Sequence, residues 1–130
     1  VPSGKICLGG FSMGGGIALQ AAARFEGSQP LGAVFCLSSY LCDDSMVWSL
    51  LEEAKTNDTN RNSLLSSPIL MMHGESDGFV LPEWGERTRR RLIDLGCAGV
   101  RPLVPIPYAG HEMTREELAQ LFEFLNTVYT

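Results

Sequence analysis

The pentapeptide at residues 10–14, Gly-Phe-Ser-Met-Gly, constrains the fold of this chain more than any other segment. The apolar run at residues 5–8 before it predicts a short buried strand, taken as residues 5–9, and the alanine-rich run after it predicts a helix to about Phe25. A strand that turns sharply into a helix at a serine holds that residue in a strained conformation, with its hydroxyl projecting from the end of the sheet. Glycines at both ends of the pentapeptide are expected because a Cβ there would collide with the neighbouring strand or helix. Ser12 is therefore the first candidate functional residue.

Length and composition predict one soluble globular domain over residues 1–130. Of the 130 residues, 45% are hydrophobic and 19% are charged. The apolar runs are shorter than the roughly 18 residues that a membrane-spanning helix needs, so no transmembrane segment is expected. A net charge of −5 argues against nucleic acid as a partner. The basic cluster of Arg87, Arg89, Arg90 and Arg91 is interpreted as the solvated face of a helix rather than an anion site.

The cysteines indicate a reducing environment. The chain has four of them, Cys7, Cys36, Cys42 and Cys97, without a metal-binding spacing. Cys7 and Cys36 lie in apolar runs, where a free thiol acts as a small buried hydrophobe. We therefore expect a cytoplasmic location; disulfides in a secreted protein are the alternative, which the spacing does not favour. No metal site is expected, and without a nucleotide or flavin motif no cofactor is expected.

Four strand–helix units follow one another along the chain. Strands are predicted at residues 5–9, 32–37, 68–72 and about 100–107, and helices at residues 13–25, 46–54 and 82–95 and after Thr114. Pro82 suits a helix start and Gly96 a helix end, and Thr114 with Glu117 forms a capping-box pattern. Prolines 102, 105 and 107 predict a short or bulged last strand. Residues 57–63 are predicted to form a loop. Alternating strands and helices predict an α/β fold, a parallel sheet of about four strands with helices on both faces.

Three polar residues follow three of the predicted strands. Ser12 follows the first, Asp77 the third and His111 the fourth, in the chain order of a Ser-Asp-His hydrolase triad. A serine hydroxyl needs a base to take its proton, and that base needs an orienting carboxylate. The other histidine, His73, is interpreted as stabilising a turn. The rivals to Asp77 as the carboxylate are Asp43, Asp44, Glu75 and Glu112.

Longer segments resemble a known family. Residues 9–16, 37–41, 73–82 and 108–112 together are similar to the acyl-protein thioesterase/lysophospholipase family of carboxylesterases, which are α/β-hydrolases. The resemblance implies Ser12 as nucleophile, His111 as general base and acid, and Asp77 as its orienting carboxylate. It also implies that the backbone N–H of Met13 is one half of the oxyanion hole. The implied activity is serine hydrolysis of acyl esters or thioesters, such as S-acylated protein cysteines or lysophospholipids; a short-chain carboxylesterase is an alternative.

The substrate-binding residues are expected in the segment after the second strand and beside Asp77. Side chains that could line an acyl tunnel near Ser12 are Tyr40, Leu41, Met46, Val47, Trp48 and Phe79. The equal alternative is that Val47, Trp48, Leu50 and Leu51 form one face of a helix packed in the core.

The start of the sequence departs from the family pattern, which has several strands before the nucleophile strand and a loop that supplies the second oxyanion donor. We therefore expect the C-terminal part of an α/β-hydrolase fold, with the N-terminal strands missing. Loss of one oxyanion donor costs roughly 10²–10³ in rate, so weak or absent turnover is expected of this chain alone. The alternative function is a catalytically inactive hydrolase-fold piece that serves in binding. The sequence leaves the oligomeric state open.

Overall fold

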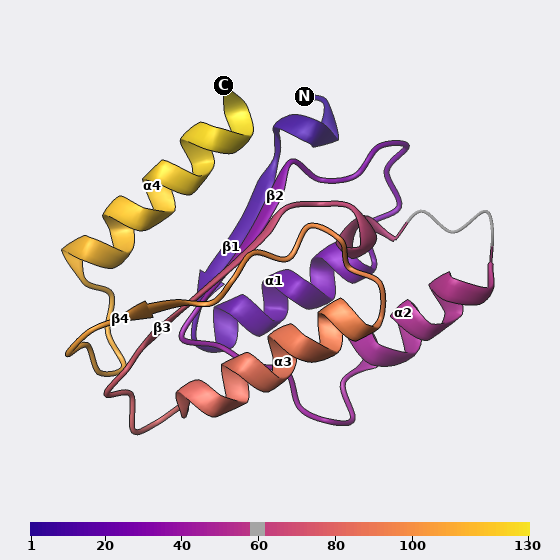
Figure 1. Ribbon diagram of the computed structural model, residues 1–130. Helices are drawn as coiled ribbons and strands as arrows, with labels where there is room; N and C mark the ends of the chain where they lie inside the picture. The colour runs from indigo at the N-terminus through magenta and orange to yellow at the C-terminus, as the bar shows by residue number, and fades with distance from the viewer. Residues whose placement is uncertain (58–61) are drawn as a thin grey trace.

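The computed structural model describes residues 1–57 and 62–130 and contains a parallel sheet. The elements, in chain order, are β1 (Cys7–Phe11), α1 (Met13–Ala23), β2 (Ala33–Leu37), α2 (Met46–Thr56), β3 (Ile69–Gly74), α3 (Pro82–Asp94), β4 (Val104–Ile106) and α4 (Arg115–Tyr129) (Figure 1). Two short 3₁₀ helices, η1 (Ser3–Lys5) and η2 (Ser63–Leu65), precede β1 and β3. Within the described residues the sheet has four strands in the order β1-β2-β3-β4. The predicted α/β fold with a parallel sheet is confirmed.

Helices cover both faces of this sheet, as predicted. The strands lie in chain order, so successive right-handed crossovers place their connecting helices on the same face. Accordingly α1, α2 and α3 share one face, while α4, which follows the last strand, packs against the other (Figure 1).

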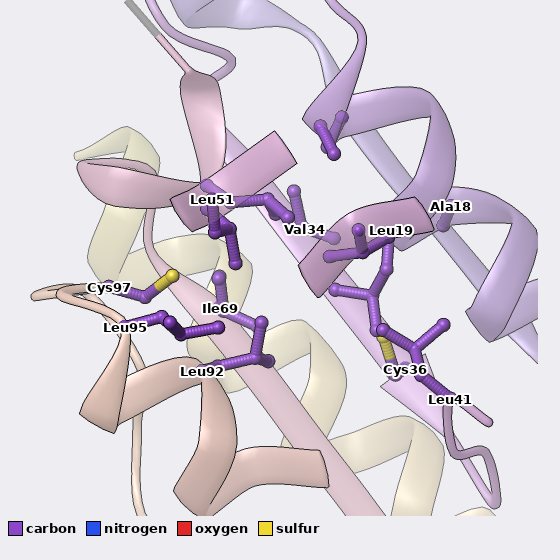
Figure 2. Close-up of a cluster of buried hydrophobic side chains, with 14 of the residues drawn as sticks. Ala18, Leu19, Val34, Cys36, Leu41, Leu51, Ile69, Leu92, Leu95 and Cys97 are labelled. Atoms are coloured by element: carbon purple, nitrogen blue, oxygen red, sulfur yellow. The ribbon is translucent and has the colours of Figure 1, made fainter. Parts of the chain in front are cut away.

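The side chains of the two central strands alternate between two hydrophobic clusters. Val34 and Cys36 of β2 face the cluster beneath α1, α2 and α3, whereas Ala33 and Leu37 face the cluster beneath α4. Figure 2 shows the first cluster, which Leu19, Leu51 and Leu92 join from the three helices. Strands buried on both faces read as continuous apolar runs, which is why β2 and β3 were recognisable from the sequence.

The first strand differs from its prediction. It runs from Cys7 to Phe11 and is half-buried, whereas Lys5 belongs to η1 and is exposed. Its register, from Cys7 beside Ala33 to Phe11 beside Leu37, sets these bounds. Among the described residues β1 pairs only with β2, which leaves its other edge without a strand. The prediction of a buried strand beginning at residue 5 is therefore wrong.

The remaining boundaries lie close to their predictions. The last strand is short, as the prolines indicated, and only a single bridge from Val100 to Ile69 precedes it. Pro82 begins α3, and Gly96 follows that helix with a left-handed φ of 99°. In the predicted loop 57–63, residues 58–61 lie outside the described residues, and Ser63 is wrongly included because it begins η2. No helix among the described residues is long and apolar enough to cross a membrane.

The helix α4 buries a carboxyl group in its first turn. The hydroxyl of Thr114 accepts a hydrogen bond from the backbone N–H of Glu117 at 3.1 Å. This bond is one half of the predicted capping box. The Glu117 side chain is only 1% exposed, and its Oε1 has no hydrogen-bond partner among the described residues. Burial raises the pKa of Glu117 to about 7, because the charged form loses its hydration.

This burial predicts that the contribution of Glu117 to the stability of the protein falls as the pH rises from about 4.5 to about 7. The unfolded chain releases the Glu117 proton near its ordinary pKa of 4.5, whereas the folded chain keeps it until about pH 7. We expect Glu117→Gln to have a melting temperature that exceeds that of the parent increasingly over this range, with a constant difference above it. Thermal unfolding followed by circular dichroism at several pH values measures the effect.

The matched control is Glu116→Gln, which changes the neighbouring exposed carboxylate. Its melting temperature is expected to follow that of the parent at each pH. If the melting temperatures of Glu117→Gln and the parent differed by the same amount at every pH from about 4.5 to about 7, the prediction would be contradicted.

Candidate active site

Ser12 sits at the turn between β1 and α1 in a strained backbone conformation. Its φ is 55° and its ψ is −122°, a region that side-chain-bearing residues rarely adopt. The Ser12 N–H donates to the Leu37 carbonyl at 2.7 Å and so fixes the turn to the end of β2. A Cβ on Gly10 would lie 2.3 Å from the carbonyl carbon of Gly14, so glycine is required there. The same expectation for Gly14 is wrong, because none of the described residues approaches its Cβ position within 4 Å.

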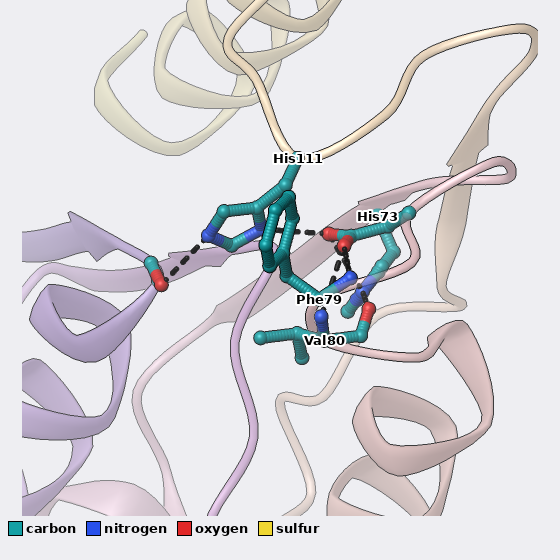
Figure 3. Close-up of polar contacts among 6 residues, drawn as sticks. His73, Phe79, Val80 and His111 are labelled. Atoms are coloured by element: carbon teal, nitrogen blue, oxygen red, sulfur yellow. Dashed lines mark hydrogen bonds and ion pairs between the residues drawn. The ribbon is translucent and has the colours of Figure 1, made fainter.

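Ser12, His111 and Asp77, which follow three of the strands, meet in one chain of hydrogen bonds (Figure 3). His111 Nε2 lies 2.9 Å from the Oγ of Ser12, and His111 Nδ1 lies 2.8 Å from the Oδ2 of Asp77. An ionised carboxylate only accepts hydrogen bonds, so Nδ1 carries the proton that is shared with Asp77. Nε2 is then the unprotonated nitrogen and can accept the serine proton. The three side chains therefore have the arrangement that activates a serine hydroxyl.

Asp77 is held ionised by its surroundings. Burial tends to raise the pKa of this carboxyl, but hydrogen bonds from His111 and from the backbone N–H groups of Val80 and Phe79 outweigh it and lower the pKa below its usual value. Both backbone N–H groups donate to Oδ1 at 2.9 Å. One oxygen of the carboxylate thus fixes the loop, and the other orients the imidazole.

His73 supports the loop that carries Asp77. Its ring is 1% exposed, and its Nε2 donates to the Val80 carbonyl at 2.7 Å while lying 3.5 Å from Asp77 Oδ2. Gly85 on α3 makes room for this ring, because a Cβ there would lie 2.8 Å from His73 Nδ1. These contacts agree with the turn-stabilising role expected from the sequence.

The carboxylate that contacts His111 Nδ1 is that of Asp77 and not one of its rivals. Asp43, Asp44, Glu75 and Glu112 are all exposed, and Asp43 lies 4.0 Å from Arg91. In the arginine cluster, Arg89 makes a bidentate pair with Glu86, and Arg91 stacks over Trp48 at 4.5 Å. These contacts support the interpretation of a helix surface rather than an anion site.

A pocket of about 500 Å³ opens beside Ser12. The predicted residues Tyr40, Leu41 and Met46 line it, together with Met13. Met13 has an exposed side chain, and because it is the first residue of α1 its backbone N–H has no acceptor within the helix.

Three predicted lining residues, Val47, Trp48 and Phe79, lie outside this pocket. Trp48 is 5% exposed and packs in the core with Val47 and Leu51, while its Nε1 donates to the Cys42 carbonyl. The prediction of Trp48 and Val47 as lining residues is therefore wrong and the helix-face alternative is right, because they occupy the inner face of α2. Phe79 is 81% exposed and lies against the His111 ring, with 5.8 Å between centroids.

Several lining residues were missed from the sequence. They are Gly16, Ile17 and Gln20 of α1, Ser39 after β2, and Cys42, Asp44, Ser45 and Val80. The members on α1 recur at helical spacing after Ser12, a signal that identifies one helix face along the pocket.

Comparisons with known proteins identify the family of this chain. A model of the Phospholipase/Carboxylesterase family matches residues 1–129. The lysophospholipase-like protein 1 of Mus musculus is 30% identical over 98% of this chain and 48% of its own length. The acyl-protein thioesterase 1 of Emericella nidulans is 31% identical over 95% of this chain and 48% of its own length. The chain thus spans about half the length of these relatives.

Solved structures share the fold. Arabidopsis thaliana SOBER1 superposes with a TM-score of 0.82 at 22% identity, covering 100% of this chain and 56% of that one. Zea mays acyl-protein thioesterase 2 superposes with a TM-score of 0.73 at 25% identity, covering 95% of this chain and 56% of that one. With a turn at Ser12, a parallel sheet and a family match over nearly all its residues, the chain belongs to the Phospholipase/Carboxylesterase family.

Proposed function

We propose that this chain carries the catalytic residues of a serine hydrolase that cleaves acyl esters or thioesters. The observation that supports this most is the hydrogen-bond chain from Ser12 through His111 to Asp77, with distances of 2.9 and 2.8 Å. Ser12 is the nucleophile, His111 the general base and acid, and Asp77 the group that orients the imidazole and stabilises its charged form.

The reaction proceeds in two halves. Ser12 Oγ attacks the acyl carbonyl carbon while His111 Nε2 takes the serine proton. The carbonyl oxygen becomes an oxyanion, which accepts a hydrogen bond from the Met13 N–H. His111 then gives the proton to the departing alcohol or thiol as its bond to the carbonyl carbon breaks, which leaves an acyl-enzyme. In the second half a water attacks this ester, its proton passes through His111 to Ser12 Oγ, and the carboxylic acid leaves.

The relatives and the pocket favour one substrate class. The names of the relatives, a lysophospholipase-like protein and an acyl-protein thioesterase, favour lysophospholipids or S-acylated protein cysteines as substrates. The pocket volume of about 500 Å³ is in the range typical of small-ligand sites. Leu41 and Met46 in its wall are suited to an acyl chain, and Phe79 beside His111 to its entrance.

The thiols support a reducing compartment such as the cytoplasm. All four cysteines are free. Burial raises the pKa values of Cys36 and Cys97 to about 12, so both thiols stay protonated and inert in the core.

A fluorophosphonate probe tests the proposal, because it reacts with an activated serine and forms a stable phosphonyl ester. We expect the intact chain to gain one label, which peptide mass spectrometry assigns to Ser12. Ser12→Ala is expected to abolish the label because it removes the nucleophile, and His111→Ala because it removes the base.

The matched control is Ser76→Ala, which removes an exposed hydroxyl near Asp77 and is expected to label as the parent does. An unlabelled parent chain, or equal labelling of the His111→Ala variant, would refute the hydrolase assignment and favour a binding piece.

Asp77→Asn tests the orienting carboxylate separately. The asparagine amide can accept the loop N–H bonds through its oxygen, but its NH₂ group then faces His111 Nδ1. That contact favours the tautomer with the proton on Nε2, which cannot take the serine proton. The corresponding change in a serine protease lowers kcat by about 10⁴. We therefore expect the labelling rate to fall by roughly 10³–10⁴.

Glu112→Gln is the control for this variant, since Glu112 is exposed beside His111 and is expected to leave the rate unchanged. A rate for Asp77→Asn close to that of the parent would show that another group orients the imidazole.

A further inference from the structure

The pocket beside Ser12 is a groove that runs along α1. The residues of this helix that line it are Met13, Gly16, Ile17 and Gln20, which recur at helical spacing and so form one stripe on the helix surface. Ser12 stands at one end of the stripe and Gln20 at the other. At a rise of roughly 1.5 Å per residue, these two positions are separated by about 12 Å along the helix axis. The groove is therefore long enough to hold an extended chain that starts at Ser12.

The segment that follows β2 forms the opposite wall of the groove. A Cβ on Gly16 would lie 3.4 Å from the carbonyl oxygen of Tyr40 and 3.8 Å from Leu41 Cδ2, so this segment runs close beside α1. Leu41 lines the groove, and so does Met46, the first residue of α2. The side chains of Ile17 and Met46 are 59% and 56% exposed, so a ligand in the groove can contact both. Together with Leu41 they give the groove an apolar surface.

Met46 lies at the end of the groove that is distant from Ser12. Its Sδ is 2.6 Å from Nη2 of Arg24, the residue that follows the last turn of α1. Arg24 is about 18 Å from Ser12 along the helix axis. Long side chains on a helix point back toward its N-terminus, so the guanidinium reaches toward the turn that carries Gln20. The contact therefore places the Met46 sulfur near the level of Gln20.

The surface of the groove changes from apolar to polar at this end. Gln20, Asp44 and Ser45 line it there, beside Met46. Burial of one methylene against an apolar wall strengthens binding by up to about fourfold, whereas a methylene beside a carboxylate or an amide gains little. With C–C bonds of about 1.5 Å, an extended alkyl chain advances roughly 1.3 Å per bond. A chain of about ten carbons therefore spans the distance from Ser12 to the level of Gln20.

We propose that the groove along α1 measures acyl chains, and that Met46, held by Arg24, ends its apolar part about ten carbons from Ser12. The site then distinguishes acyl chains up to this length and treats longer ones alike, because their further methylenes stay in water. Met46 sets the limit by contact with the chain, and Arg24 is a positioning residue that acts through Met46. This inference rests on the proposed function, because the chain is measured from the acyl carbon on Ser12.

A series of n-alkyl fluorophosphonates from butyl to tetradecyl tests the proposal, with the phosphorus in place of the acyl carbon. The measurement is the second-order rate constant for labelling Ser12, followed by intact mass spectrometry on the full chain at probe concentrations that form no micelles. We expect the rate constant of the parent to rise with each methylene up to about ten carbons and to stay level beyond.

Two variants locate the chain along the groove. Met46→Ala is expected to label as the parent does with the butyl probe and about tenfold more slowly with the decyl and longer probes, since it removes the burial of about two methylenes. Ile17 lies about 7.5 Å from Ser12 along the axis, so the loss caused by Ile17→Ala is expected to begin at about six carbons. Arg24→Ala is expected to cause a smaller loss than Met46→Ala, with the same dependence on chain length, because Met46 keeps its apolar surface but not its position.

Ile93→Ala is the matched control. Ile93 is an apolar side chain of α3 that is 43% exposed, but it does not line the groove. This variant is therefore expected to keep the rate constant of the parent with every probe.

Three results would overturn the inference. Rate constants of the parent that do not change with chain length, with Ser12 still labelled, would refute the groove as an acyl site while leaving the hydrolase proposal intact. An equal loss for Met46→Ala with all probes, butyl included, would assign Met46 to the fold and not to chain length. No label on Ser12 from any probe would remove the proposed function and this inference with it.

Discussion

The parallel register of the strands is the constraint on which the rest of the structure depends. The first backbone N–H after each of β1, β2 and β3 donates a hydrogen bond to the last residue, or the last but two, of the neighbouring strand. The bonds are Ser12 N–H to the Leu37 carbonyl at 2.7 Å, Ser38 N–H to the Met72 carbonyl at 2.9 Å, and Glu75 N–H to the Ile106 carbonyl at 3.0 Å. These bonds bring the ends of four strands level at one edge of the sheet. A slip of one residue would turn every side chain to the opposite face and separate the residues that follow the strands.

Close backbone contacts then fix the two loops that meet Ser12. The loop after β3 is held through both oxygens of Asp77 and through the buried His73 ring. The loop before α4 rests directly on the end of β3, where a Cβ on Gly74 would lie 2.5 Å from the carbonyl oxygen of Ala109. The Ser76 N–H also donates to that carbonyl at 2.9 Å. The imidazole and the carboxylate are therefore positioned by one set of backbone contacts rather than by two independent loops.

Local sequence patterns predicted the elements and the order of the site residues, since these depend on short-range features. Buried strands read as apolar runs, and the turn at Ser12 has its own glycine signature. The errors lie where the outcome depends on which element packs against which. For Trp48 the pocket and the core are equal alternatives from the sequence, because a local pattern does not tell which face of α2 is turned to the sheet. No described residue approaches the Cβ position of Gly14, and the burial of Glu117 arises where α4 packs on the sheet, which no local pattern records.

The burial of His73 also separates the chemistry of the two imidazoles in this chain. Its ring is enclosed between α3 and the Asp77 loop, whereas the side chain of His111 keeps 19% of its surface accessible. An electrophile that acylates histidine from solution therefore meets a single reactive ring in the folded protein. Histidine acylation of the folded protein therefore reports on the His111 ring alone, and the His73 ring reacts only when the fold opens.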